Sequence, residues 1–154
     1  MKQEEAILNL SSFILIGATI VKAIERNETL SRLVQSGAEP LFIIATIATT
    51  LSLWQYRNWR FTAVSLSLLT AFTVARFPDI HAAFAILFFA SSAFVIARDK
   101  RLNKLSFLFI GATAIIPLSL MWFEVVSISI TIAYHVIYLW WNSAPLRRQL
   151  MNRL

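Results

Sequence analysis

Cysteine is absent from this chain of 154 residues, and its absence excludes disulfide bonds, thiolate metal sites and cysteine nucleophiles. Charged residues are also scarce: they make up 14% of the chain, whereas about a quarter is usual in soluble domains. Apolar residues take their place, reach 58% of the chain and give a mean hydropathy of +0.67. This composition favours an integral membrane protein over a soluble domain.

Common catalytic motifs are missing as well. The sequence contains no GxSxG, HExxH or P-loop pattern,. Glu124 is the only acid near the most polar predicted helix face, so no pair of carboxylates is predicted to share a site,. We therefore expect a protein that is not an enzyme.

Six apolar segments follow one another along the chain, and most approach the about 20 residues that a membrane crossing needs. They are residues 6–24, 40–56, 61–75, 81–97, 105–123 and 125–141. We predict an all-α integral membrane protein, a single domain made of a six-transmembrane-helix bundle, with a basic cytoplasmic tail at residues 142–154. The third segment gives only about 22 Å of helix. Either its flanking arginines reach the interfaces or the segment is re-entrant. Pro117 is predicted to kink the fifth helix.

The basic residues lie in short loops between the apolar runs, so the net charge of +6 indicates topology and not nucleic-acid binding,. The fourth segment fixes the orientation, because a basic cluster follows it: Arg98, Lys100, Arg101 and Lys104. With the N-terminus inside, ten of the fourteen Lys and Arg residues are cytoplasmic. We predict that both termini are cytoplasmic. Trp59 is expected at the inner interface and Trp122 at the outer one.

The beginning of the chain lacks the cleavage pattern of a signal peptide, so we expect the first helix to be retained,. Together with the short loops, this favours a bacterial inner (cytoplasmic) membrane. In the longest outer loop, residues 25–39, apolar side chains recur at helical spacing: Leu30, Leu33 and Val34. This loop is predicted to lie on the membrane surface as a short amphipathic helix.

The sixth segment carries the clearest polar pattern, a single helix face. Its members are Glu124, Ser127, Thr131, Tyr134, His135 and Tyr138. Such a face must turn inward in a bilayer, because unsatisfied polar groups are costly there. Thinner polar stripes on the first two helices are expected to do the same: Asn9, Ser12, Thr19, Thr46, Thr49 and Thr50. The face either serves interhelical hydrogen bonding alone or forms a pocket for a lipid headgroup, a quinone or a proton.

Two histidines could suggest a haem with two protein ligands. His81 follows Asp79 in the outer turn that precedes the fourth helix, whereas His135 lies about 15 Å deep in the sixth,. That separation argues against a shared iron, and a zinc site lacks ligands at one depth. We expect no cofactor and no metal, with His135 neutral and hydrogen-bonded to a Tyr or Thr.

The second half of the chain resembles a known family. The turn Phe77-Pro78-Asp79 followed by His81, the aromatic fourth helix (Phe84, Phe88, Phe89) and the basic loop after it look like the DRAM/Frag/Sfk-type six-helix membrane proteins, whose bacterial members are mostly of unknown function. Glu124 also resembles an acidic residue at that place in the family. The similarity covers residues 76 to about 141, and the shorter first loop departs from it. The resemblance implies a non-enzymatic protein associated with lipid or membrane homeostasis.

Three hypotheses follow from the sequence. The first is a non-catalytic multi-pass membrane protein that binds lipid or a membrane partner protein, including a second copy of itself. The second is a small transporter or proton-linked carrier that uses the polar face of the sixth helix. The third is an accessory subunit of a larger membrane complex.

Overall fold

The computed structural model describes residues 3–35, 39–116 and 119–142, and every element in these ranges is helical. The predicted all-α class is thereby confirmed. The elements are α1 (Gln3–Arg26), the 3-10 helix η1 (Leu30–Gln35), α2 (Glu39–Trp54), the 3-10 helix η2 (Arg57–Trp59), α3 (Arg60–Ala71), α4 (Pro78–Arg98), α5 (Lys104–Thr113) and α6 (Leu120–Asn142).

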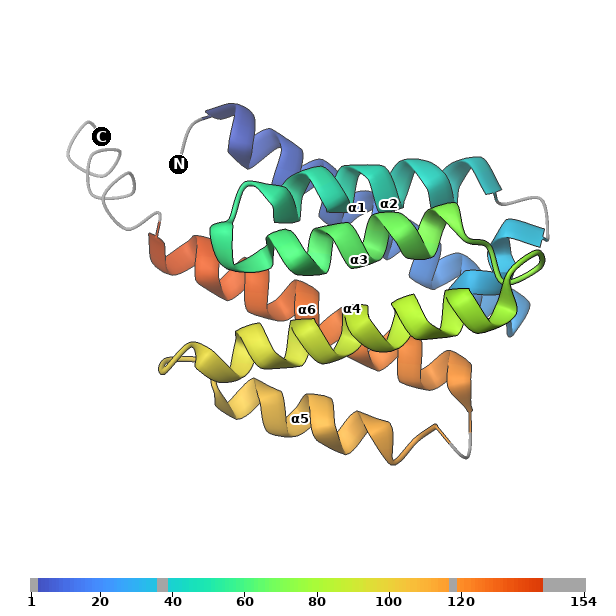
Figure 1. Cartoon of the computed structure of the whole chain (residues 1–154). Helices are drawn as coiled ribbons and strands as arrows, with labels where there is room; N and C mark the ends of the chain where they lie inside the picture. Colours follow the sequence, from blue (N-terminus) through green and yellow to red (C-terminus); the bar gives the residue numbers. More distant parts are fainter. Residues whose placement is uncertain (1–2, 36–38, 117–118, 143–154) are drawn as a thin grey trace.

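Successive helices run in alternating directions, and the connections gather at two ends of the bundle (Figure 1). The turn at η2 and the loop after α4 lie at one end, while η1 and the α3–α4 loop lie at the other. Neighbours in sequence pack against each other, and α6 also contacts α1, α4 and η1. Because α6 touches elements from both halves of the chain, its polar face lies inside the bundle.

Two boundaries at the connection between α3 and α4 differ from the predicted ones. α4 begins at Pro78 and not at residue 81, because proline suits the first turn of a helix and Asp79 favours its positive end,. α3 ends at Ala71 and not at residue 75. The carbonyls of Leu69 and Phe72 at that end accept a hydrogen bond from His81, as described below.

The fifth and sixth helices differ most from their predicted ranges, 105–123 and 125–141. α5 has only 10 residues and ends at Thr113, and α6 begins at Leu120. The prediction treated Glu124 as an interfacial charge between two helices. Glu124 is instead buried inside the bundle, so α6 continues through it toward its own N-terminus. The kink predicted at Pro117 lies outside the described residues, as does the tail at 142–154 beyond Asn142.

The distribution of side chains is inverted relative to a soluble protein. Large apolar residues point outward, with Phe107 71% exposed and Ile86 68% exposed, while Asn9, Thr19 and Ser127 are buried. Three helices are long and apolar enough to cross a membrane: Ile7–Arg26, Pro78–Arg98 and Leu120–Tyr138. Two shorter apolar helices, Pro40–Trp54 and Lys104–Thr113, lie beside them. These features are typical of a protein whose outer surface faces lipid.

The loop after α1 does not extend as the free surface helix that its pattern predicted. Asn27 adopts a left-handed conformation (φ 53°), which Asn tolerates better than most residues, and the chain reverses there,. Leu30 and Leu33 then pack into a buried cluster with Ala23 and Phe42. The segment is helical, as its spacing predicts, but the apolar side of η1 covers the end of the bundle. The Val34 side chain is not among the described ones.

Candidate functional site

The predicted polar face of α6 is divided between two separate hollows. Glu124, Thr131 and His135 line a cavity inside the bundle. Tyr134 and Tyr138 line a pocket on another side of α6, which opens between α3 and α4. Ser127 is fully buried and lines neither. The six side chains therefore share one helix but do not form one site.

Glu124 is a buried carboxylate that connects two distant parts of the chain. It is 7% exposed, and its Oε2 accepts a hydrogen bond of 2.7 Å from the backbone N–H of Leu30. Leu30 is the first residue of η1, where backbone N–H groups lack partners within the helix,. A carboxylate is the favoured acceptor at such a helix start. Glu124 thereby attaches η1 to α6.

His135 lies in an aromatic surrounding at the other end of the same cavity. Its ring centroid is 4.4 Å from that of Trp59 and 6.1 Å from that of Tyr56. Nδ1 lies 2.9 Å from the backbone carbonyl oxygen of Thr131 and therefore carries the proton of a neutral ring,. Its partner is a backbone carbonyl and not the Tyr or Thr hydroxyl that the sequence suggested. Nε2 is buried and has no hydrogen-bond partner among the described residues.

The internal cavity between these two groups has a volume of about 70 Å³. Glu124 and His135 are about 16 Å apart along α6, at about 1.5 Å per residue. Ser12, Thr46 and Ser52 add hydroxyl groups to a mainly apolar wall. A space of this size suits water molecules.

A hydrogen-bonded network near His135 joins α1 to α2 and to the turn that follows α2. Asn9 Nδ2 donates to the Tyr56 hydroxyl (3.0 Å) and to the backbone carbonyl of Glu5 (2.7 Å), and the Ser52 hydroxyl donates to Asn9 Oδ1. Burial raises the pKa of Tyr56 above its ordinary value, which keeps this hydroxyl protonated,. The polar stripes were predicted to point inward, and this is confirmed for four of their residues, which are buried: Asn9, Ser12, Thr19 and Thr46. Thr49 and Thr50 are half-buried.

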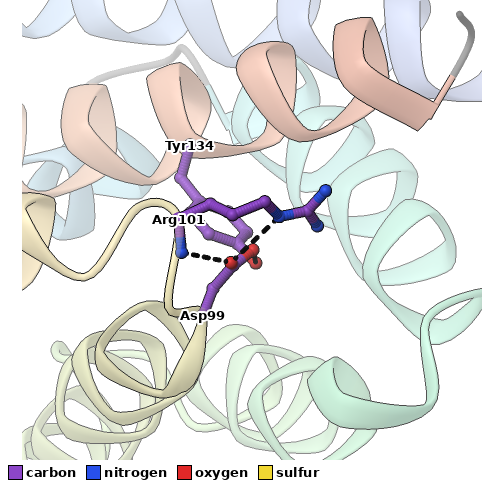
Figure 2. A network of polar contacts seen from close by, with 3 residues as sticks. All are labelled: Asp99, Arg101 and Tyr134. Atoms are coloured by element: carbon purple, nitrogen blue, oxygen red, sulfur yellow. Dashed lines mark hydrogen bonds and ion pairs between the residues drawn. The ribbon is translucent and has the colours of Figure 1, made fainter.

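Figure 2 shows the polar contacts of the second hollow. The Tyr134 hydroxyl donates to Asp99 Oδ2 (3.2 Å), and Asp99 Oδ1 accepts from the backbone N–H (3.0 Å) and the Nε (3.4 Å) of Arg101. Asp99 was missed in the sequence because it stands inside a basic cluster. Tyr134 stacks on Tyr138, with centroids 5.9 Å apart. The pocket has a volume of about 620 Å³.

The two residues of the outer turn have different positions. Asp79 is exposed in the first turn of α4. His81 is buried, and its Nδ1 lies 2.7 Å from the Phe72 carbonyl oxygen and 3.1 Å from that of Leu69. His81 thus joins α4 to the end of α3. No group of three or more His, Asp or Glu residues within the described ranges is arranged to hold a metal ion.

A third hollow is a groove of about 620 Å³ on the outside of the bundle, lined by α4, α5 and α6. Four alanines of α4 line it: Ala82, Ala85, Ala90 and Ala93. Their small side chains leave the space, and Phe109, Ile110 and Phe123 form the facing wall. Arg32, Thr29 and Pro78 lie at the end where α4 begins, and Glu124 also reaches this groove. No sequence pattern predicted it, because it depends on how α5 packs.

Trp59 also differs from its predicted interfacial position. It is 3% exposed and packs in the core against Tyr134 and His135. Trp54, one helical segment earlier, is exposed and lies under the Arg60 guanidinium, 5.6 Å from the ring centroid. Trp122 is exposed, as predicted for an interfacial residue.

Comparisons of the chain with known protein families, with curated protein sequences and with solved structures found no match.

The Glu124 carboxylate can be tested through the amide that it binds. Replacing Glu124 by Leu removes the acceptor, which costs about 1–3 kcal/mol for a buried N–H left without a partner. We expect hydrogen exchange at the Leu30 amide to become about tenfold faster or more. Glu124→Gln keeps a side-chain oxygen and should preserve most of the protection. Equal protection of Leu30 in wild type and Glu124→Leu would show that the bond does not hold η1.

Proposed function

We propose that this chain is a six-span protein of a cytoplasmic membrane, with both ends inside, that acts without catalysis by binding an anionic membrane lipid in the groove between α4, α5 and α6. The charge distribution supports the orientation. Basic residues are concentrated at the end of the bundle that carries η2 and the α4–α5 loop, namely Arg57, Arg60, Arg98, Lys100, Arg101 and Lys104 (Figure 1). Cytoplasmic loops carry such an excess.

The observation that carries the lipid proposal is the groove itself. Its walls are almost wholly apolar, and it follows α4 from Pro78 to Ala93. That length is about 22 Å of helix, which exceeds the about 15 Å of hydrocarbon in one leaflet of a bilayer about 30 Å thick. An acyl chain therefore fits along it.

The charge at one end favours an anionic headgroup. Arg32 lines the groove beside the start of α4, on the outer side in the proposed orientation. It forms no ion pair with any residue that the structure describes. A guanidinium binds a phosphate through paired hydrogen bonds. The groove thus combines an apolar length with a cation at the depth of the outer headgroups.

The orientation can be tested by labelling, since the chain has no cysteine of its own. Asp79 and Asn103 are exposed at opposite ends of α4. We expect a membrane-impermeant maleimide to label Asp79→Cys in intact cells, and Asn103→Cys only after the membrane is opened. If Asp79→Cys is shielded like Asn103→Cys, α3 does not cross and the six-span topology is wrong.

Lipid binding can be tested by native mass spectrometry of the purified full chain with added phosphatidylglycerol. Ala90→Phe places a ring in the groove and should lower the number of lipids retained per chain by one. Arg32→Gln removes the cation and should weaken retention about tenfold, in line with the strength of charged hydrogen bonds.

Two matched variants serve as controls. Ala83→Phe adds the same ring at an exposed position of α4 outside the groove, and Arg76→Gln removes an exposed outer charge that does not line it. Both should retain the lipid as the wild type does. Retention by all four variants alike would refute the groove as the site, and a stoichiometric protein in place of the lipid would favour the accessory-subunit hypothesis.

A proton-linked carrier is the second candidate function. The buried Nε2 of His135 favours it, since this acceptor has no partner among the described residues and its ring lines a cavity shared with Glu124. Ionisable groups within a membrane domain often mark proton pathways. The small volume suits waters, along which a proton can move,.

This candidate predicts a proton flux in vesicles that contain the purified chain and a pH-sensitive dye. His135→Ala should abolish the flux. Ser127→Ala is the matched control, because Ser127 is also a buried α6 residue without a hydrogen-bond partner among the described residues, yet it does not line the cavity. Wild-type flux no greater than that of empty vesicles would exclude the carrier. A His135→Ala variant that conducts normally or only unfolds more easily would make His135 structural.

A further inference from the structure

The half-polar pocket between α3, α4 and α6 is a second binding site that the proposed function does not use. Its α4 residues, Ser91, Phe94, Val95 and Arg98, form one helical stripe,. The alanines that line the lipid groove form another stripe on the opposite face of the same helix. The pocket is therefore separate from the groove and lies toward the other end of α4.

We propose that this pocket binds a phosphate group through Arg98 and Arg101. Both arginines line the pocket, and Asn58, Tyr134 and Tyr138 supply further hydrogen-bonding groups. Planar guanidinium groups match the tetrahedral oxygens of phosphate through paired N–H bonds. The wall below them is closed by a hydrogen bond of 2.9 Å from Thr62 Oγ1 to Ser91 Oγ, which joins α3 to α4.

Arg101 has a fixed position within this arrangement. Asp99 binds both its backbone N–H and its Nε, and the buried Tyr134 hydroxyl holds the other oxygen of Asp99 (Figure 2). The Asp99 side chain is only 13% exposed. A basic side chain that is oriented before binding loses less freedom when the ligand arrives.

Arg98 lines the same pocket. Its guanidinium carbon lies 5.5 Å from the centroid of the Phe94 ring, and Phe94 is also a lining residue. Arg98 forms no ion pair with a described residue. The lining thus holds two guanidinium groups and one carboxylate, that of Asp99, and this excess of positive charge favours an anion.

A phosphate group of this kind occurs both in a phospholipid headgroup and in a phosphorylated solute. Phe61 and Phe94 line the pocket and are largely exposed on the outer surface of the bundle, so that the acyl chains of a phospholipid could lie against them. A phosphorylated solute could enter from the basic end of the bundle. That this end faces the cytoplasm rests on the proposed orientation, whereas the pocket itself does not depend on it.

The test uses the full chain with Ala90→Phe as background, so that a lipid in the groove does not contribute. Retention of phosphatidylglycerol is measured by native mass spectrometry, with and without millimolar inorganic phosphate as competitor. The double variant Arg98→Gln/Arg101→Gln should lower retention about tenfold or more, because charged hydrogen bonds are lost. Lys100→Gln/Lys104→Gln removes the same charge from the same loop at positions that do not line the pocket, and it should change retention less than about twofold.

Each outcome decides the proposal. Loss in the arginine variant alone supports it, and displacement by inorganic phosphate then identifies a solute, while resistance to phosphate identifies a lipid headgroup. Equal loss in both double variants, or no loss in either, overturns it. Arg98→Gln alone leaves the contacts of Asp99 with Arg101 and Tyr134 in place, and it replaces the double variant if that one fails to fold. Failure of the groove proposal would appear separately, as unchanged lipid retention in the Ala90→Phe background.

Discussion

The end of the bundle that carries η1 depends on the hydrogen bond between the Glu124 carboxylate and the Leu30 amide. This bond joins α6 to η1 across 94 positions of sequence. With η1 held there, Leu30 and Leu33 pack into the bundle, and Arg32, between them, lines the groove between α4, α5 and α6. Glu124 also lines both the internal cavity and this groove. One buried carboxylate thus borders an interior space and a hollow on the outside of the bundle.

The inside of the bundle is governed by a second constraint, the cost of leaving polar groups without partners away from water. Most hydroxyl groups satisfy it locally by donating to a carbonyl one turn earlier, as Thr46 and Ser92 do. Asn9 also donates to a carbonyl one turn earlier, that of Glu5, and in addition it binds the hydroxyl groups of Tyr56 and Ser52. His135 satisfies only one of its nitrogens in this way. On α6, the Ser127 hydroxyl likewise has no hydrogen-bond partner among the described residues.

The helical class and the inward polar faces could be read from the sequence, because composition and spacing record which side of a helix faces lipid. The helix ends near Glu124 could not, since a charge in a sequence looks interfacial until its hydrogen-bond partner is known. The division of the polar face of α6 between two hollows could not be read from the sequence either. Tyr134 and His135 are adjacent in sequence, yet Tyr134 lines one hollow and His135 lines the other. Asp99, Arg32 and the alanines of α4 acquire their roles only through the packing of distant segments.

The lengths of neighbouring helices have a mechanical consequence for the surrounding membrane. α4 has 21 residues and α5 has 10, which correspond to about 31 Å and about 15 Å. In the proposed membrane setting a bilayer matches one of these lengths and not the other, so lipids next to α5 would thin or tilt. That strain would fall on the side where α4 and α5 border the groove. A lipid that moved from this deformed layer into the groove would relieve part of the deformation.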